Sequence, residues 1–329
     1  MGTPTTRSAT LDDVARAAGV SRATASRVLG GYGFASPDAR DRVAAAADRL
    51  GYVPNTAARA LVRGGGVRLV VAVVGRDDSL FDDPYVDRVV SAAARVCAPH
   101  GFGVTLEWLS RRALSELRRL GDDRSVAGML LVNTTQEALD AVPASMRGRV
   151  ASIGIGSPAV PSFDVDNAGG AEAVLRHLHA GGHRRIAMIT GPRWLTCAER
   201  SVTAYRSLMR AAGLPVRVVR GDFTAARGGR AALEVLDRWP DTDAIYAASD
   251  ATALGAIAAL RGRGVQVPHD VAVAGFDDIP YAAVSSPPLT TATHPVARIA
   301  TAAATAVLHE RRAEPVTFFP STLVARESA

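Results

Sequence analysis

From residue 67 onwards, apolar runs alternate with amphipathic runs, and this alternation limits the fold more than any other feature. Residues 68–74 form a continuous apolar run, which is typical of a strand buried on both faces. Further strands are predicted at residues 103–108, 128–132, 149–153, 185–190, 216–221, 244–248 and 270–274. Helices are predicted between most of them, at residues 84–99, 169–181, 199–213, 225–239, 251–264 and 295–311. The pattern predicts an α/β body with doubly wound parallel sheets, and its length favours two lobes.

The first 64 residues show a different pattern, with apolar residues at helical spacing in 11–18, 22–29 and 38–50. Ser21 and Ser36 stand directly before the second and third runs, where helix N-caps are found. Gly19 breaks the chain between the first two runs. These residues predict a small all-α head of three short helices.

Positive charge is concentrated in this head. Residues 1–64 contain nine arginines and five acidic residues, a net charge of +4, whereas the whole chain carries +6. This distribution suits a head that binds a polyanion such as nucleic acid. A compositional bias toward arginine, with no partner implied, explains the charge equally well, since the chain contains no lysine.

Other classes of protein are excluded by composition. Two cysteines, Cys97 and Cys197, are too few for a disulfide framework or a four-thiolate zinc site. No run of 18 apolar residues and no secretory signal is present, so we expect a cytoplasmic protein with no membrane partner. We also expect no metal and no cofactor, because the histidines at 177, 179 and 183 do not share one helix face.

The stretch from Leu11 to Leu29 has the layout of a helix-turn-helix. Its second helix displays Arg22, Ala23, Ser26 and Arg27. Arginines and hydroxyls on an exposed helix face suit contacts with phosphates and base edges in a DNA major groove. An ordinary helical hairpin with solvated arginines is the alternative.

The same stretch resembles the head of the LacI (lactose repressor) family of bacterial transcription regulators. The matching residues are Asp13-Val14-Ala15, Ala18-Gly19-Val20-Ser21 and Thr24-Ala25-Ser26-Arg27-Val28-Leu29. The resemblance continues at Leu50-Gly51-Tyr52-Val53-Pro54-Asn55 and at Gly275-Phe276-Asp277-Asp278-Ile279-Pro280. It covers nearly the whole chain. It implies a helix-turn-helix head at residues 1–53, a hinge helix and linker at 54–66, and an effector-binding and dimerisation domain at 67–329.

In this family the two residues after the capping serine read operator bases, which implies that role for Arg22 and Ala23. Arg27 matches another position that contacts a base or a phosphate. Phosphate contacts, which set register without reading sequence, are implied for Thr10, Ser21, Thr24, Ser26 and Asn55.

The hinge helix is implied by Pro54 to Leu61. Two such helices pack in the minor groove of an operator bound by a dimer, and Leu61 would insert between base pairs. Ala58, like its small neighbours, allows close approach to the groove. The alternative is that Leu61 packs the linker against the body.

The resemblance also implies two lobes like those of periplasmic binding proteins, with an effector between them. The first lobe would contain residues 67–164 and 294–319, and the second would contain 165–293 and 320–329. Candidate ligand contacts follow the predicted strands, at Tyr85, Phe223, Ser249, Asp250, Asp277 and His294. Tyr85 and Phe223 offer ring faces, and an ionised Asp277 would accept two hydroxyl hydrogens of a sugar. Asp250 and Asp278 could instead cap the helices that follow them.

One position departs from the family pattern. Ser201 stands where the family often has an effector-binding arginine, and Arg200 is its neighbour, so both are candidate effector contacts. Because one residue on a helix rotates a side chain by about 100°, Arg200 need not reach the cleft. The departure favours a neutral polyhydroxylated ligand over an anionic one.

The predicted function is sequence-specific DNA binding by a dimeric transcription regulator, most simply a repressor, that responds to a small sugar. Its DNA partner would be a double-stranded, pseudopalindromic operator in the nucleoid. An α/β enzyme acting on sugars or nucleotides, with an accessory DNA-binding head, is the rival prediction. A plain binding protein is a weaker rival, because it does not explain the head.

Overall fold

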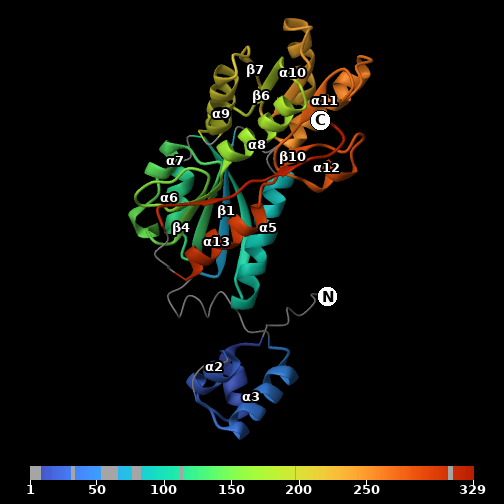
Figure 1. Ribbon diagram of the computed structural model, residues 1–329. Helices are drawn as coiled ribbons and strands as arrows, with labels where there is room; N and C mark the ends of the chain where they lie inside the picture. Colours follow the sequence, from blue (N-terminus) through green and yellow to red (C-terminus); the bar gives the residue numbers. More distant parts are fainter. Residues whose placement is uncertain are drawn as a thin grey trace, which may run out of the picture. The chain divides into compact units, whose positions relative to one another are not determined.

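The computed structural model describes residues 9–30, 34–52, 66–75, 83–111, 114–196, 198–309 and 314–329. The chain separates into two compact units, Met1–Val67 and Arg68–Ala329. We call them the head and the body; many of their elements are labelled in Figure 1. In the part of the chain that is described, no helix is long and apolar enough to cross a membrane.

The head contains the three helices predicted from the sequence, α1 (Leu11–Ala18), α2 (Arg22–Gly30) and α3 (Pro37–Leu50). Thr10 and Asp13 form a reciprocal capping box at the start of α1, and Gly19 ends this helix in the left-handed conformation with φ 62°. Small side chains allow the helices to pack closely around Val14 and Val43, and Ala25 of α2 is fully buried among them.

The body contains a six-stranded parallel sheet in the order β11-β5-β4-β3-β1-β2. Its strands are β1 (Arg68–Gly75), β2 (Gly103–Ser110), β3 (Val126–Val132), β4 (Val150–Ile153), β5 (Ser162–Val165) and β11 (Val316–Phe319). Helices α5 (Pro84–Cys97) and α13 (Val296–Leu308) pack together on one face. Helices α6 (Leu114–Asp122) and α7 (Gln136–Asp140) contribute to the core on the other face.

A second parallel sheet has the order β7-β6-β8-β9. Its strands are β6 (Ile186–Thr190), β7 (Arg217–Arg220), β8 (Ala244–Ala247) and β9 (Ala272–Ala274). Helices α8 (Asn167–Ala180) and α9 (Ala198–Ala211) pack on one face. Helices α10 (Ala225–Arg238) and α11 (Asp250–Gly262) pack against each other on the opposite face.

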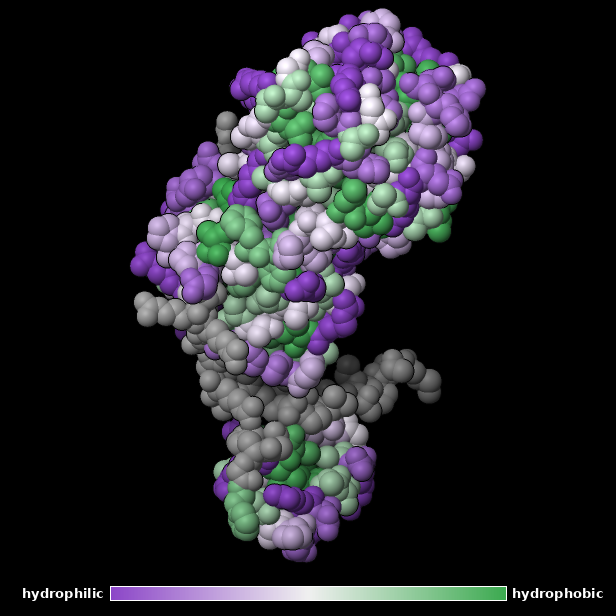
Figure 2. All heavy atoms as spheres, in the orientation of Figure 1, coloured by the Kyte–Doolittle hydropathy of each residue, from purple (hydrophilic) through white to green (hydrophobic). Residues whose placement is uncertain are grey.

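The remaining elements of the body are short. Strand β10 (Thr291–Ala292) pairs antiparallel with β12 (Leu323–Val324), and α12 (Pro280–Val284) follows β9. Single turns of 3-10 helix lie at Ala98–His100 and Ala144–Met146. The chain passes between the lobes after β5, after β10 and after β11. On the face drawn in Figure 2, hydrophilic side chains cover much of the four-stranded lobe, and apolar ones form separate patches.

The predicted fold class is confirmed: a small helical head is joined to an α/β body of two parallel-sheet lobes. The sequence analysis did not predict β5, β10, β11, β12, α6, α7 or α12. Most of these elements have five residues or fewer, and the residues of β11 alternate between exposed and half-buried. Such segments lack the long apolar periodicity on which the predictions depended.

Candidate functional site

The first candidate site is the exposed face of α2 in the head. Ser21, Arg22, Ala23 and Arg27 are exposed there, and Thr24 and Ser26 are half-buried. The Ser21 hydroxyl accepts a 3.1 Å hydrogen bond from the Thr24 amide, which caps the helix. The face therefore presents hydroxyls at the helix start and arginines along it, an arrangement that fits a DNA backbone and groove.

Both arginines of this face make weak contacts at the surface. Arg22 lies 3.3 Å from the Asp12 carboxylate, and the two side chains are 71% and 57% exposed. An exposed ion pair of this kind contributes about 0.2–1 kcal/mol, so it opposes a move of Arg22 toward DNA only slightly. The Arg27 guanidinium donates to the carbonyl of Ala23 at 3.3 Å and to that of Phe34 at 3.4 Å.

The remaining predicted DNA contacts do not belong to α2. Thr10 is half-buried and caps α1 through its hydroxyl. Asn55, Ala58 and Leu61, which carry the hinge-helix prediction, lie outside the described residues.

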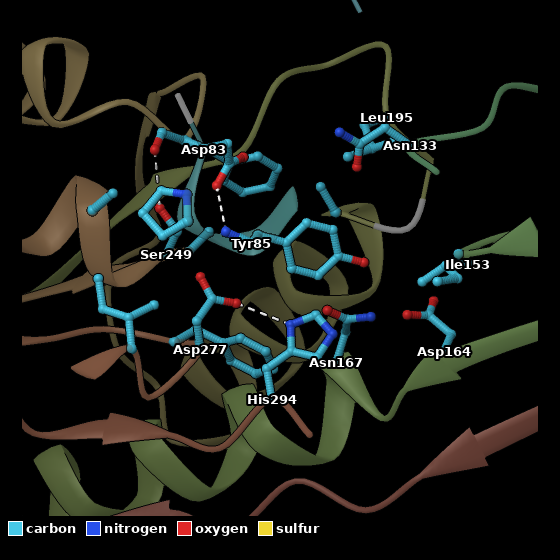
Figure 3. A pocket seen from close by; sticks show the side chains of 18 residues that line it. Asp83, Tyr85, Asn133, Ile153, Asp164, Asn167, Leu195, Ser249, Asp277 and His294 are labelled. Atoms are coloured by element: carbon cyan, nitrogen blue, oxygen red, sulfur yellow. Dashed lines mark hydrogen bonds and ion pairs between the residues drawn. The ribbon is translucent and has the colours of Figure 1, made fainter. Parts of the chain in front are cut away.

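The second candidate site is a cavity in the body that is open to solvent. Its lining residues follow the carboxyl ends of strands from both sheets (Figure 3). Ligands in open α/β sheets bind at this edge, because the loops there converge. The cavity therefore lies where a ligand would touch both lobes at once.

Five of the predicted effector contacts line this cavity: Tyr85, Phe223, Ser249, Asp277 and His294. Tyr85 belongs to the first turn of α5, which Pro84 begins and Asp83 caps. Phe223 follows β7 and Asp277 follows β9, whereas Ser249 caps α11 after β8. We expected ligand-binding side chains to follow strand ends. This expectation identified lining residues that are more than 200 positions apart in the chain.

Three predicted contacts, Arg200, Ser201 and Asp250, do not line the cavity. Arg200 binds the Asp164 carboxylate, and the Ser201 hydroxyl donates to the carbonyl of Asn167. Asp250 is fully buried and accepts hydrogen bonds from the Thr291 hydroxyl at 2.6 Å and the Ile279 amide at 2.9 Å. Asp250 thus holds two loops of the second lobe in place.

The helix-capping alternatives for Asp250 and Asp278 were wrong. Ser249, not Asp250, is the N-cap of α11, because its hydroxyl accepts from the Thr252 amide. Asp278 accepts a 2.7 Å hydrogen bond from the Arg326 guanidinium instead of capping α12.

Other lining residues were not among the predicted contacts: Asp83, Asn133, Asp164, Asn167 and Phe276. Asn133 directly follows β3, so the strand-end rule could have found it. Asp164 lies inside β5, a strand that the sequence analysis did not predict. Together these five residues give the cavity carboxyl and amide groups beside aromatic rings, a mixture suited to a ligand ring with several hydroxyls.

No arginine lines the cavity among the described residues. Two arginines, Arg88 and Arg200, contact lining residues from outside the cavity. Arg88 of α5 donates to the carbonyls of Asp277 at 3.3 Å and His294 at 3.1 Å. The sequence offered no signal for Arg88, because the contact joins residues about 200 positions apart.

Asp277 and His294 form a pair, with 3.0 Å between Oδ1 and Nδ1. Burial and the nearby charge of Asp83 raise the pKa of the Asp277 carboxyl well above its usual range. Burial lowers the pKa of His294 to about 4. One oxygen of Asp277 is therefore already occupied by His294, which leaves the other for a ligand.

Strained backbone is concentrated at the cavity. Among the described residues, four other than glycine have positive φ, and three of them line it: Asn133 at 55°, Phe223 at 71° and Asp277 at 120°. Such conformations cost about 1–3 kcal/mol each and cluster at ligand sites. In the described part of the chain, no group of histidine, cysteine or acidic residues could hold a metal ion.

Comparison with known families gives two matches along the chain. Residues 10–55 match "Bacterial regulatory proteins, lacI family", and residues 175–329 match "Periplasmic binding protein-like domain". The first covers the helices of the head, and the second contains the four-stranded sheet.

Curated relatives are HTH-type transcriptional regulators. CelR of Thermobifida fusca is 37% identical over 302 residues, covering 88% of each protein. The ribose operon repressor of Escherichia coli (strain K12) is 32% identical over 321 residues, covering 92% of each. CytR of the same organism, a transcriptional repressor, is 29% identical and covers 87% of this chain and 85% of its own length.

Solved structures of transcription regulators are also similar to this chain. A CelR–cellobiose complex superimposes with a TM-score of 0.70 at 33% identity, covering 98% of this chain and 100% of the other. A lac repressor dimer bound to operator and the anti-inducer ONPF has a TM-score of 0.85 at 24% identity, covering 98% and 99%, and supports the fold. Full-length similarity to regulators favours a regulator over the rival prediction of an enzyme. The chain belongs to the LacI family of bacterial transcription regulators.

Proposed function

We propose that this chain is a repressor that binds a pseudopalindromic operator as a homodimer, and that a neutral sugar in the cavity between the lobes controls this binding. The composition of the cavity carries the sugar proposal. Tyr85, Phe223 and Phe276 supply rings, and acidic and amide groups surround them. Since no arginine lines the cavity among the described residues, a phosphate group would find no cationic partner there.

The head supports the operator proposal through its exposed α2 face. We assign base reading to Arg22, Ala23 and Arg27, and phosphate contacts to Thr10, Ser21, Thr24 and Ser26. Asn55, Ala58 and Leu61 would extend this surface into the minor groove as a hinge helix. We propose the following domain organisation for the chain. The head spans residues 1–53, and the hinge and linker span 54–66. One lobe contains 67–164 and 294–319, and the other contains 165–293 and 320–329.

Two relatives guide the choice of probes. CelR was solved with cellobiose, so cellobiose is the first sugar to test. The lac repressor was solved as a dimer on operator DNA, which supports the proposed stoichiometry. Because its DNA partner lies in the bacterial cytoplasm, we place the protein there, associated with the nucleoid.

The proposal is tested on the full chain with an operator selected in vitro from random double-stranded DNA. Footprinting should show two half-sites about one helical turn apart. Thermal shift with neutral sugars, their phosphates and purines then identifies the ligand class. Stabilisation by phosphorylated or purine compounds alone would overturn the sugar proposal, and a single sufficient half-site would overturn the dimer.

A further inference from the structure

A loop of the four-stranded lobe reaches the six-stranded lobe beside the cavity. Residues 191–196 of this loop follow β6 and precede α9. Trp194 is half-buried and packs against the core that lies between the six-stranded sheet and helices α6 and α7. The buried residues of that core all belong to the six-stranded lobe. The side chain of Trp194 therefore joins the two lobes at a place where the backbone does not cross.

An arginine of the six-stranded lobe holds the same ring. Arg111 directly follows β2, and the carbon of its guanidinium lies 5.8 Å from the centre of the Trp194 ring. A guanidinium within about 6 Å of a tryptophan ring is attracted to the face of that ring. This attraction adds to the apolar contact with the core, so both contacts of Trp194 hold the lobes together.

The contact lies far from the chain crossings in the order of the sheet. The six strands are arranged as β11-β5-β4-β3-β1-β2, and two of the three crossings follow β5 and β11, at one edge. Arg111 follows β2, which forms the opposite edge. Crossings at one edge act as a hinge, about which the lobes can part at the other edge. The contact between Trp194 and Arg111 restrains that other edge.

The same loop forms part of the cavity wall. Leu195, the residue after Trp194, lines the cavity and is only 3% exposed (Figure 3). Its amide donates to the carbonyl of Pro192 at 3.1 Å, which closes a turn. At the start of the loop a Cβ on Gly191 would lie 2.3 Å from the Phe223 ring, so the backbone packs tightly there. Because the path of the loop is fixed, a movement of Trp194 also moves Leu195.

We propose that Trp194 and Arg111 form a clasp that keeps the lobes closed around the effector without contacting it. Neither residue lines the cavity. A ligand that contacts both lobes binds only the closed arrangement, so its apparent affinity depends on the fraction of the protein that is closed. The clasp raises this fraction. Trp194 and Arg111 are thus positioning residues for the sugar, and this inference rests on the proposed function.

The clasp is tested first without a sugar. The chain contains three tryptophans, so Trp108→Phe combined with Trp239→Phe leaves Trp194 as the only indole. In this full-length background, Arg111→Ala should make acrylamide quenching of Trp194 about twofold stronger, because the edge opens more often. Arg118→Ala, which removes an exposed arginine of α6, is the control. Equal quenching with and without Arg111→Ala would overturn the proposal.

The effect on the effector is measured with the neutral sugar that stabilises the protein, cellobiose being tried first. Trp194→Ala should weaken binding about tenfold, mainly through faster dissociation, and Arg111→Ala about threefold. Trp194→Phe keeps a ring on the core and should recover most of the loss. The matched control is Arg238→Ala, because Arg238 lies 4.7 Å from the Trp239 ring within one lobe. Unchanged circular dichroism shows that each variant folds.

A last measurement separates a clasp from a tryptophan that only stabilises its own loop. Saturation with the sugar should reduce acrylamide quenching of Trp194 about twofold, because a bound ligand keeps the lobes closed. Unchanged sugar affinity in Trp194→Ala, or unchanged quenching with a sugar that binds, would overturn the clasp and leave the repressor proposal intact. A protein in which Arg111→Ala exposes Trp194, but which no neutral sugar stabilises, would overturn the proposed ligand class while supporting the clasp between the lobes.

Discussion

Nη1 of Arg200 donates a 2.6 Å hydrogen bond to Oδ2 of Asp164, and this ion pair joins the two lobes at the edge of the cavity. Asp164 comes from β5 of the six-stranded sheet, whereas Arg200 comes from α9 beside the four-stranded sheet. Asp164 is 5% exposed and lines the cavity, and Arg200 is 30% exposed outside it. Arg200 thus stabilises a carboxylate that lines the site.

Removing this arginine should destabilise the body. Burial already raises the pKa of the Asp164 carboxyl, and the charge of Arg200 opposes that rise. In Arg200→Ala the carboxylate loses its partner, so we expect the free energy of unfolding to fall by about 1–3 kcal/mol, measured by urea denaturation. Arg206→Ala, an exposed change on the same helix, is the control. Equal losses in both variants would contradict the role of the ion pair.

Much of the fold was predictable because the relevant segments are long. The strand β1 is buried at nearly every position, and α5 and α9 have one buried face, so periodicity alone located them. The strand β5 has four residues, and its buried Ser162 and Asp164 hide its strand character. Pairing between β5 and β11 joins residues about 150 positions apart, which no local pattern encodes.

The candidate site was predictable where side chains follow strand ends, as with Tyr85, Phe223 and Asp277. It was not predictable where the direction of a side chain decides whether the residue lines the cavity. Arg200 turns toward Asp164, and Asp250 turns into the core toward Thr291. A neighbour distant in the sequence fixes each direction, so only the structure shows which residues reach the cavity.

The stability of the protein should depend on pH through Asp277. Burial raises the pKa of this carboxyl in the folded state, while an unfolded chain ionises it at its usual value. Between these two values the folded state binds more protons, so the free energy of unfolding falls as pH rises. Asp277→Asn should therefore show a smaller fall than the parent as the pH rises above the usual pKa of an aspartate. Denaturation curves with the same pH dependence for both proteins would contradict this.

Arg22 should contribute to operator affinity. Arg22→Ala should cost about 1–3 kcal/mol and relax base preference at one position of each half-site, as measured by titration of operator variants. Asp12→Asn should strengthen binding slightly, since it frees Arg22 from its ion pair. Asp38→Asn, which frees Arg42 of α3, provides the matched control. Unchanged affinity and base preference in Arg22→Ala would exclude the reading role.

Leu61 should bend the operator. If its side chain inserts between base pairs, Leu61→Ala should reduce both the bend angle and the affinity, because the kink depends on an apolar wedge. A fluorescence-transfer assay with dyes at both ends of the operator measures the bend, and Leu50→Ala in the head is the control. An unchanged bend angle would mean that Leu61 packs the linker instead.

The most direct test of the account is the operator affinity of the full chain, measured with and without the neutral sugar that stabilises it in the thermal shift screen. We predict that the sugar changes operator affinity by about 5–150-fold, the usual range for coupling between two sites. Phosphorylated sugars should leave operator affinity unchanged, since the described residues that line the cavity include no arginine for a phosphate. A sugar that binds the body without altering operator affinity would contradict the central claim that the cavity controls the head.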